Sequence, residues 1–171
     1  MIYFFSTWLK ILSKSHFNFI IKDLTLCFSN VYISMDELRL NRYTEIINYI
    51  VESIPFISPR FTKEIEKRGA YYSIQTTIES SIDLIAMLVK DYGLIVKNDA
   101  ENIHKLVEHK NLNPEIGERL IKANGLRNIL VHRYNGIDDS IILDSMKEIN
   151  DIVEIWLNKI EELLDELRNL E

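Results

Sequence analysis

The chain has 171 residues, of which 47% are hydrophobic and 27% are charged, and its formal net charge is −6. This length allows one domain with a real core, and five Gly and three Pro are too few for the many turns of an all-β fold. The single cysteine, Cys27, excludes a framework of internal disulfides and is typical of a reducing cytoplasm, and the spacing of the four histidines predicts no zinc site.

Residues 1–34 differ from the rest of the chain in composition and charge. They are rich in Phe, Ser, Ile and Leu and carry a net charge of +2, whereas the remainder carries −8. Their apolar runs are too short to cross a bilayer, which takes about 20 apolar residues, and they lack the pattern of a signal peptide. We expect Met35 to be the biological start and residues 1–34 to be an upstream extension; a membrane-surface anchor or an added helix is the alternative.

The regular helical pattern begins after Met35. Asp36 is a suitable N-cap, and the apolar residues that follow recur at the i, i+3, i+4, i+7 spacing of one buried stripe. Pro55 interrupts this first helix, and Ser58 with Pro59 is a typical cap and first-turn pair for the next helix. The stripe of the first helix consists of Tyr43, Ile46, Ile47, Ile50, Val51 and Ile54.

The second predicted helix covers residues 59–92. It ends at Gly93, because glycine suits the left-handed conformation that follows many helices. The helix is unusually long, so we expect it to bend or break near Gly69. Its predicted buried stripe consists of Phe61, Ile65, Tyr72, Ile78, Ile82, Ile85 and Val89.

Three more helices follow. A short one over residues 99–110 directs Ile103, Leu106 and Val107 inward. Asn113 and Pro114 are again a typical cap and first-turn pair, and they open a fourth helix. A turn is predicted at residues 135–136, after which Asp138 or Asp139 caps a last helix. Its stripe consists of Ile142, Met146, Ile149, Val153, Trp156, Ile160, Leu163, Leu164 and Leu167. The pattern predicts an all-α, antiparallel up-and-down bundle of four to five helices over residues 35–171.

Three polar residues near the end of the fourth helix are not explained by helix capping: Arg127, His132 and Tyr134. On an ideal helix Arg127 and Tyr134 lie nearly on one line, whereas His132 points roughly 140° away from Arg127. Either the helix loosens before His132, or a second copy of the chain supplies one of the two side chains in a symmetric dimer.

The spacing of these residues, R-x4-H-x-Y, resembles the motif of the HEPN ribonucleases, and the chain is similar more narrowly to the HepT toxins. The similarity covers about residues 35–167, including the strings SIQTTIESSID at 73–83 and GLRNILVH at 125–132. The resemblance implies a helical bundle of the HEPN type that acts as a homodimer. It also implies an RNA endonuclease that works without a metal or another cofactor.

The residue types of the motif suit RNA cleavage. The resemblance implies that Arg127 and His132 are catalytic, with Arg127 stabilising the negative charge that builds at phosphorus. An imidazole titrates near pH ~6.5, so His132 is able to take a proton from a 2′-hydroxyl or to give one to the leaving oxygen. Attack by the 2′-oxygen would leave a cyclic phosphate, and which of the two proton transfers His132 performs stays open.

Three further residues are candidates for supporting this site. Asn128 either supports Arg127 or caps the helix. Glu79 and Asp83 follow Gln75 at i, i+4 and i+8 along one edge of the second helix. Either they orient Arg127 or His132, or they form a solvated flank or an ion pair with a neighbouring helix.

The resemblance also implies a partner. The chain would be the toxin of a type VII system, neutralised by an MntA-type nucleotidyltransferase antitoxin that attaches AMP to the motif tyrosine, Tyr134. The alternative is a non-catalytic helical module that binds nucleotide or a partner and acts with a nucleotidyltransferase. The acidic body favours local contacts with RNA over bulk attraction, because broad affinity for nucleic acid rests on basic patches.

Overall fold

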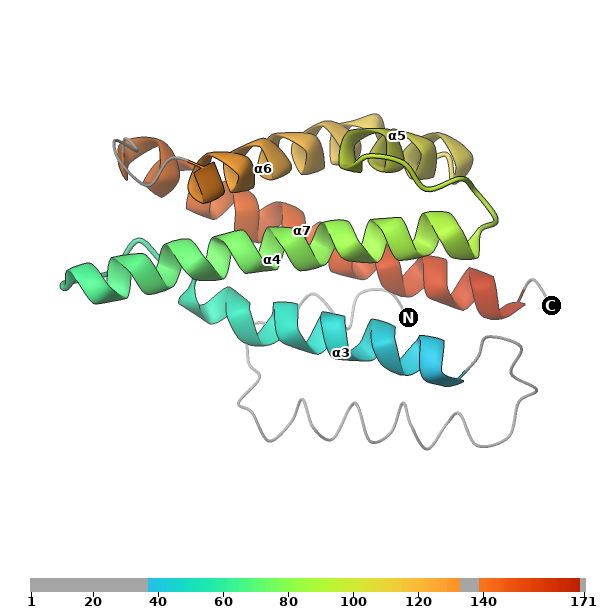
Figure 1. The fold of residues 1–171 in the computed structure, drawn as a ribbon, viewed down its shortest axis with the longest axis horizontal. Coiled ribbons are helices and arrows are strands. Elements are labelled where there is room, and N and C mark those ends of the chain that lie inside the picture. The colour runs from blue at the N-terminus through green and yellow to red at the C-terminus, as the bar shows by residue number, and fades with distance from the viewer. Residues whose placement is uncertain (1–36, 133–138, 170–171) are drawn as a thin grey trace. The chain divides into compact units, whose positions relative to one another are not determined.

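The computed structural model describes residues 37–132 and 139–169, and within these ranges the chain is all-α, as predicted (Figure 1). Successive long helices run in opposite directions, which confirms the antiparallel up-and-down bundle. The predicted extension over residues 1–34, the start at Met35, the Asp36 cap and the turn at residues 135–136 lie outside the described residues. The elements are α3 (Glu37–Ser53), the short 3-10 helix η2 (Ile54–Phe56), α4 (Glu64–Asp91), α5 (Asp99–His109), α6 (Pro114–His132) and α7 (Asp139–Asn169).

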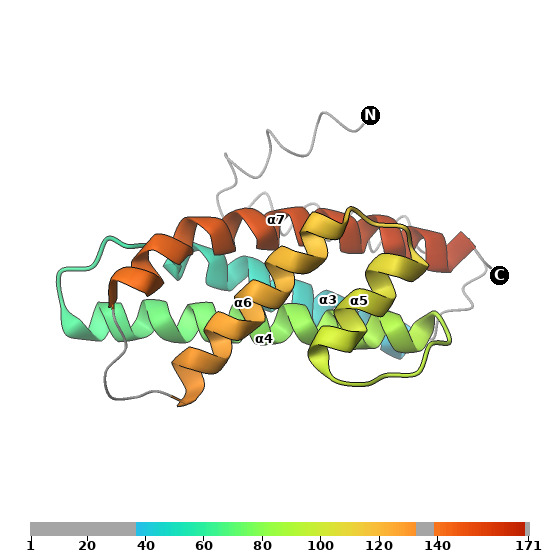
Figure 2. The ribbon, with the colours of Figure 1, turned by 90° about the horizontal axis from the view of Figure 1, so that it is seen from above.

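Helix α4 is the centre of the bundle. It packs against α3, α5, α6 and α7. Viewed from above, α6 crosses α4 obliquely, and α5 lies next to the first half of α6 (Figure 2). In both views the C-terminal end of α6 lies towards the N-terminal half of α4. None of the described helices is long and apolar enough to span a membrane.

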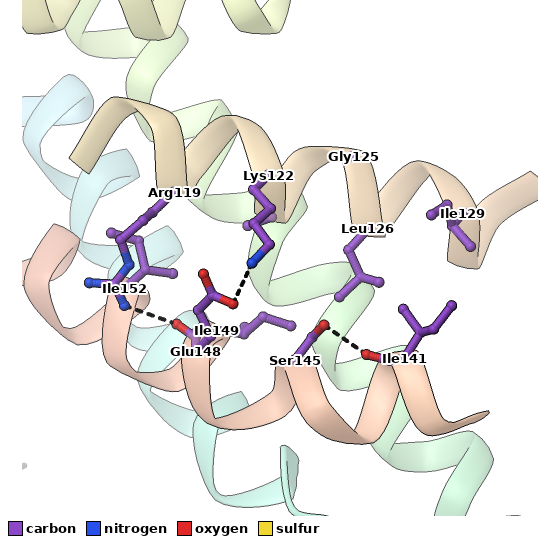
Figure 3. Close-up of a pocket in the computed structure, with 11 residues that line it drawn as sticks. Arg119, Lys122, Gly125, Leu126, Ile129, Ile141, Ser145, Glu148, Ile149 and Ile152 are labelled. Atoms are coloured by element: carbon purple, nitrogen blue, oxygen red, sulfur yellow. Dashed lines mark hydrogen bonds and ion pairs between the residues drawn. The ribbon is translucent and has the colours of Figure 1, made fainter. Parts of the chain in front are cut away.

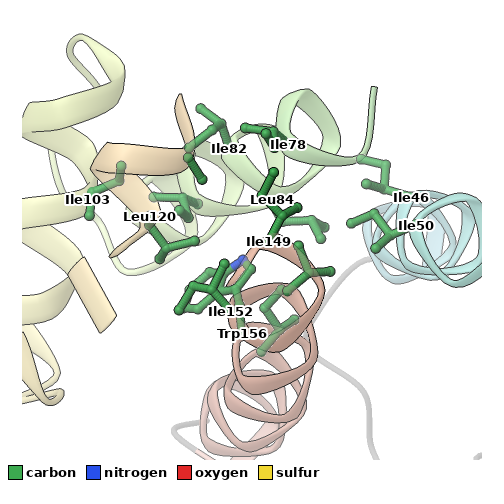
Figure 4. Close-up of a cluster of buried hydrophobic side chains, with 14 of the residues drawn as sticks. Ile46, Ile50, Ile78, Ile82, Leu84, Ile103, Leu120, Ile149, Ile152 and Trp156 are labelled. Carbon is green, nitrogen blue, oxygen red and sulfur yellow. The ribbon is translucent and has the colours of Figure 1, made fainter. Parts of the chain in front are cut away.

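The core consists mainly of isoleucine and leucine side chains from α3, α4, α5, α6 and α7, and Trp156 lies among them (Figure 4). The predicted stripe of α7 is confirmed, because its members from Ile142 to Leu164 are buried and Leu167 packs against them. Each fully buried aliphatic side chain contributes roughly 1.5–3 kcal/mol. Figure 4 shows Ile78, Ile82 and Leu84 of α4 on one side and Ile149, Ile152 and Trp156 of α7 on the other.

Three predicted helix boundaries are confirmed. Asn98 caps α5 by accepting a hydrogen bond from the backbone N–H of Glu101, and Pro114 is the first residue of α6. Gly93 has φ 72°, and the N–H groups of Gly93 and Leu94 donate to carbonyls of the last turn of α4. This pattern of two hydrogen bonds closes the helix and requires the positive φ that glycine adopts without strain.

The predicted start of the second helix at Ser58 and Pro59 is wrong. Helix α4 begins at Glu64, because Glu66 forms a capping box in which its carboxylate accepts hydrogen bonds from the backbone of Thr62 and Lys63. Ser58 instead accepts a hydrogen bond from the backbone N–H of Arg60 within the loop that precedes the helix.

The predicted stripe of the second helix is right from Ile78 onward and wrong at Ile65 and Tyr72, whereas Phe61, which precedes α4, packs against the core. Ile65 and Tyr72 are exposed, and the buried positions of this half are Ala70 and Ile74. The line that runs back from Ile78 in steps of four passes through Ala70, a small residue that hydrophobicity alone does not single out. The expected break near Gly69 is also absent, since α4 is continuous from Glu64 to Asp91.

A partly buried hydrogen-bond cluster connects α3 to the end of α4. The hydroxyl of Tyr43, which is fully buried, donates to Asp91 Oδ2 at 2.7 Å, and Arg39 Nε donates to the same oxygen at 2.9 Å. Burial raises the pKa of Tyr43. The phenol therefore stays protonated and acts as a donor to the carboxylate.

We expect Tyr43→Phe to lower the free energy of unfolding by about 1 kcal/mol, because Asp91 loses a buried donor while the ring is kept. Urea unfolding followed by circular dichroism measures this change. Tyr49→Phe on the same helix is the control, because Tyr49 is 41% exposed and its loss should cost less than about 0.5 kcal/mol. Equal losses in the two variants would contradict a stabilising role for the Tyr43 hydroxyl.

Candidate active site

Arg127 of α6 forms an ion pair with Glu79 of α4. Its Nε donates to Glu79 Oε2 at 2.5 Å, and its Nη2 donates to the same oxygen. Its Nη1 donates to Asn128 Oδ1 at 3.0 Å. The side chain of Arg127 is 22% exposed and that of Glu79 is 46% exposed. The guanidinium is therefore held on two sides while part of it faces solvent.

The two contacts orient Arg127 more than they stabilise the fold, because half-exposed ion pairs contribute little to folding free energy. Both Glu79 and Asn128 were singled out from the sequence, and the structure brings both to Arg127. Asn128 lies four residues before the end of α6 and contacts Arg127, so it does not cap the helix. Among the described residues the guanidinium donates to Glu79 and Asn128 alone, and a guanidinium has two N–H groups more than these three bonds use, which suit an anion.

Asp83 lies one helical turn beyond Glu79 on the same edge of α4. The hydrogen bonds of Arg127 go to Glu79 and Asn128, and none goes to Asp83. Partial desolvation raises the pKa of Asp83 above its ordinary value of 3.8, and the negative charge of Glu79 raises it further. The charges of Arg42 and Arg127 act in the opposite direction. Asp83 thus contributes negative charge to the edge of the site without binding Arg127.

His132 does not lie beside Arg127. Helix α6 continues through His132, and the side chain of His132 is exposed. The expectation that the helix loosens before this residue is therefore wrong. In an unbroken helix the two side chains point roughly 140° apart, so one chain does not direct both at the same atom. The other option, a second copy that supplies one of them, stays a prediction.

Tyr134, the third residue of the motif, lies outside the described residues. The helix that follows it is fastened to α4 through Asp139. Tyr71 donates its hydroxyl to Asp139 Oδ1 at 2.7 Å, and Lys67 Nζ lies 2.9 Å from Asp139 Oδ2. Desolvation and the bound carboxylate raise the pKa of Tyr71. Sequence reasoning missed this cluster, because its three members lie on two helices far apart in the chain.

An apolar hollow of about 320 Å³ lies between α6 and α7 (Figure 3). Its walls include Leu126 and Ile129 of α6 and Ile141 of α7, which is 54% exposed. Gly125 also lines it, and His132 lies seven residues further on, nearly on the same line of the helix. The face of α6 that carries His132 is therefore continuous with this hollow, whereas Arg127 faces α4.

No group of three or more His, Cys, Asp or Glu side chains within residues 37–132 and 139–169 is placed to hold a metal ion. The polar groups gathered around Arg127 are instead two carboxylates and one amide. This arrangement suits a fixed cation with a defined orientation, which binds phosphate well.

Comparison with known proteins adds independent observations. The sequence model of the family described as Ribonuclease HepT-like matches residues 40–163. A protein of Archaeoglobus fulgidus, named as a candidate RNase, is 41% identical over 76% of this chain and 98% of its own length.

Two solved structures share the fold. One is a mutant of the toxin–antitoxin complex MntA-HpeT, with a TM-score of 0.62, 20% identity and coverage of 70% of this chain and 98% of its own. The other is a tri-AMPylated HEPN toxin of Shewanella oneidensis in complex with MNT antitoxin, with a TM-score of 0.62, 18% identity and coverage of 75% and 99%. At these identities the likeness shows the fold alone.

We expect Glu79→Gln to lower the pKa of Asp83, because the change removes a neighbouring negative charge and releases Arg127 to attract Asp83. A carboxyl NMR titration measures this shift. Glu154→Gln on α7 is the control, since Glu154 is not among the charges that act on Asp83. A pKa of Asp83 that is unchanged in Glu79→Gln would show that the two carboxylates do not interact.

The same raised pKa has a consequence for stability. A carboxyl whose folded-state pKa is raised stabilises the fold fully below its unfolded pKa, and this contribution is lost as the pH rises through the folded value. As the pH rises from 3 to 7, the free energy of unfolding of Asp83→Asn should therefore increase relative to that of the unsubstituted chain. Urea unfolding at the two pH values measures this difference. A constant difference between the two chains would contradict the raised pKa.

Proposed function

Because the chain belongs to the HepT-like ribonuclease family, we propose that it is a cytoplasmic ribonuclease toxin of a two-gene toxin–antitoxin system. The observation that carries the proposal is the oriented guanidinium of Arg127, held by Glu79 and Asn128 five residues before His132. These residues lie within the matched range 40–163. The likeness of the fold to two toxins solved with their antitoxins supports the assignment to such a system.

The proposed reaction is cleavage of RNA by its own 2′-hydroxyl. The 2′-oxygen forms a bond to phosphorus while the bond from phosphorus to the 5′-oxygen breaks, which gives a cyclic phosphate and a free 5′-hydroxyl. His132 transfers the proton, either from the 2′-hydroxyl or to the leaving oxygen. Arg127 stabilises the extra negative charge at phosphorus, so the reaction requires no metal to make a nucleophile.

Glu79, Asn128 and Asp83 are supporting residues in this proposal. Glu79 and Asn128 keep the guanidinium in one orientation, which lowers the entropy that Arg127 loses on binding phosphate. Asp83 does not touch Arg127 and would act through its charge. When Asp83 is protonated, the edge of α4 carries less negative charge and repels the RNA less strongly.

The proposed active unit is a homodimer. Arg127 and His132 point roughly 140° apart on one uninterrupted helix, so a site that uses both needs α6 of a second copy. The apolar hollow between α6 and α7 is continuous with the face of His132 and offers a surface for this second copy. A two-fold axis beside α6 would bring Arg127 of each protomer towards His132 of the other.

The proposed regulator is an MntA-type nucleotidyltransferase that attaches AMP to Tyr134. The phenol oxygen would attack the α-phosphate of ATP, and pyrophosphate would leave. The attached phosphate would compete for Arg127, and the nucleoside would obstruct the cleft by its size. The tri-AMPylated state of the Shewanella oneidensis toxin, in complex with its antitoxin, supports this kind of regulation.

Expression of the chain alone should slow growth, and Arg127→Ala or His132→Ala should each abolish that effect, since each removes one proposed catalytic group. The matched controls are Arg68→Ala on α4 and His104→Ala on α5, since both side chains are exposed and neither lines the hollow between α6 and α7. Growth curves at equal expression measure the effect. If either catalytic variant remains as toxic as the unsubstituted chain, its proposed role is wrong.

Cleavage of RNA by the purified protein should persist in excess EDTA, because the proposed nucleophile is the 2′-hydroxyl of the substrate. Product analysis should show cyclic phosphate ends. Loss of cleavage in EDTA that returns with a divalent cation would contradict the metal-independent mechanism. Tight nucleotide binding without any cleavage would favour the alternative, a non-catalytic module.

Co-expression with an MntA-type nucleotidyltransferase should add multiples of the mass of AMP to the peptide that contains Tyr134. Mass spectrometry of the purified toxin measures this addition. Tyr134→Phe should remove it, because no phenol oxygen remains, whereas Tyr49→Phe should not. An unmodified peptide from fully neutralised toxin would contradict AMPylation and leave physical blocking by the bound partner.

A further inference from the structure

A second hollow, of about 500 Å³, lies where η2 and the following loop meet the start of α4. We call it the aromatic hollow, because Phe56, Phe61 and Tyr72 line it together with Arg60. Phe56 is 66% exposed and Tyr72 is 62% exposed, so both side chains are largely open to solvent. Its volume lies within the range of roughly 300–1,000 Å³ that is usual for ligand sites.

The neighbour of Tyr72 explains why this ring faces outward. Tyr71 packs against the core and donates its hydroxyl to Asp139 at 2.7 Å. Adjacent residues of a helix point about 100° apart, so fixing Tyr71 directs Tyr72 away from the core. The exposure of Tyr72 is thus built into the fold and does not depend on its own contacts.

The charge in the aromatic hollow suits an anionic ligand. Within residues 37–132 and 139–169, the guanidinium of Arg60 forms no ion pair, and Arg60 is exposed. The one carboxylate that lines the hollow, Glu66, accepts hydrogen bonds from Thr62 and Lys63 in the capping box. A free cation beside exposed aromatic rings is the combination with which proteins bind single-stranded nucleic acid.

The aromatic hollow is aligned with the candidate active site. Tyr72 and Glu79 are seven residues apart on α4, so they lie nearly on one line of the helix and about 10 Å apart along it. Glu79 binds Arg127, and the C-terminal end of α6 lies towards the N-terminal half of α4 in both views. The direction from Glu79 to Tyr72 is therefore also the direction in which α6 runs from Arg127 to His132.

From this alignment we propose that the aromatic hollow is a binding subsite for single-stranded RNA, in which Tyr72 and Phe56 stack on bases and Arg60 binds a phosphate. The proposal rests on the proposed ribonuclease function and adds to it the part of the chain that holds the strand beside the cleaved bond. An aromatic ring accepts any base, so this subsite contributes affinity without strong sequence preference.

The test measures binding of a fluorescent single-stranded RNA of about twelve nucleotides by anisotropy, with the full chain carrying His132→Ala so that the RNA stays intact. Adding Tyr72→Ala or Phe56→Ala should raise Kd roughly tenfold, the usual effect of losing one stacked base. Tyr72→Phe should keep the affinity, because the ring remains. Ile65→Ala is the matched control, since Ile65 is exposed on the same helix but does not line the hollow.

Two further binding experiments separate base stacking from other effects on the affinity for RNA. Gly69→Leu should also weaken binding, because a side chain at Gly69 would enter the hollow, while a Cβ there meets no atom within 4 Å and leaves the fold undisturbed. An RNA of the same length with abasic sites should bind the Tyr72→Ala protein and the parent equally. The abasic RNA keeps the phosphates, so equal binding assigns the difference to the bases.

An unchanged Kd in Tyr72→Ala and Phe56→Ala would overturn the subsite, even if the unsubstituted chain cleaves RNA. Cleavage is measured separately, so a chain that binds through the hollow but cleaves nothing would instead overturn the proposed function. If the two variants bind RNA normally but no longer bind the nucleotidyltransferase, the hollow is a protein-binding surface and the proposal is wrong. Absence of RNA binding by the parent would also overturn it.

Discussion

The uninterrupted course of α6 through His132 is the constraint on which the candidate site depends. Because the helix does not loosen, Arg127 faces α4 while His132 points roughly 140° away, along the face continuous with the hollow between α6 and α7. Glu79 and Asn128 then hold the guanidinium in place. A single chain therefore presents two halves of a site on two faces, and a symmetric partner is the simplest way to join them.

The rest of the fold keeps α6 in this position. Helix α4 packs against α3, α5, α6 and α7, so the helix at the centre of the bundle also carries Glu79 towards α6. Asp139, held by Tyr71 and Lys67, fastens the start of α7 to α4. Both helices that flank residues 133–138 are thus tied to one scaffold. Precise placement of functional groups on rigid helices is what catalysis by orientation requires.

Hydrophobic periodicity was sufficient to predict the all-α class and the stripe of α7, because apolar side chains at helical spacing have few alternative arrangements. It failed at the start of α4, where the capping box of Glu66 replaces the expected cap at Ser58 and where Ala70 takes the core position. At the candidate site, the sequence pointed to the motif residues and to a contact between Glu79 and Arg127. The hydrogen bonds from Tyr71 and Lys67 to Asp139 could not be predicted, because such contacts depend on how helices far apart in the sequence pack.

The most direct test of this account mixes two inactive proteins, one carrying Arg127→Ala and the other His132→Ala, and measures RNA cleavage after their subunits exchange. In a composite site each mixed dimer has one site with both changes and one intact site. Random pairing should then recover about a quarter of the unsubstituted activity. If each chain held a complete site of its own, every site in the mixture would carry one change. A mixture that exchanges subunits and stays inactive would contradict the shared site.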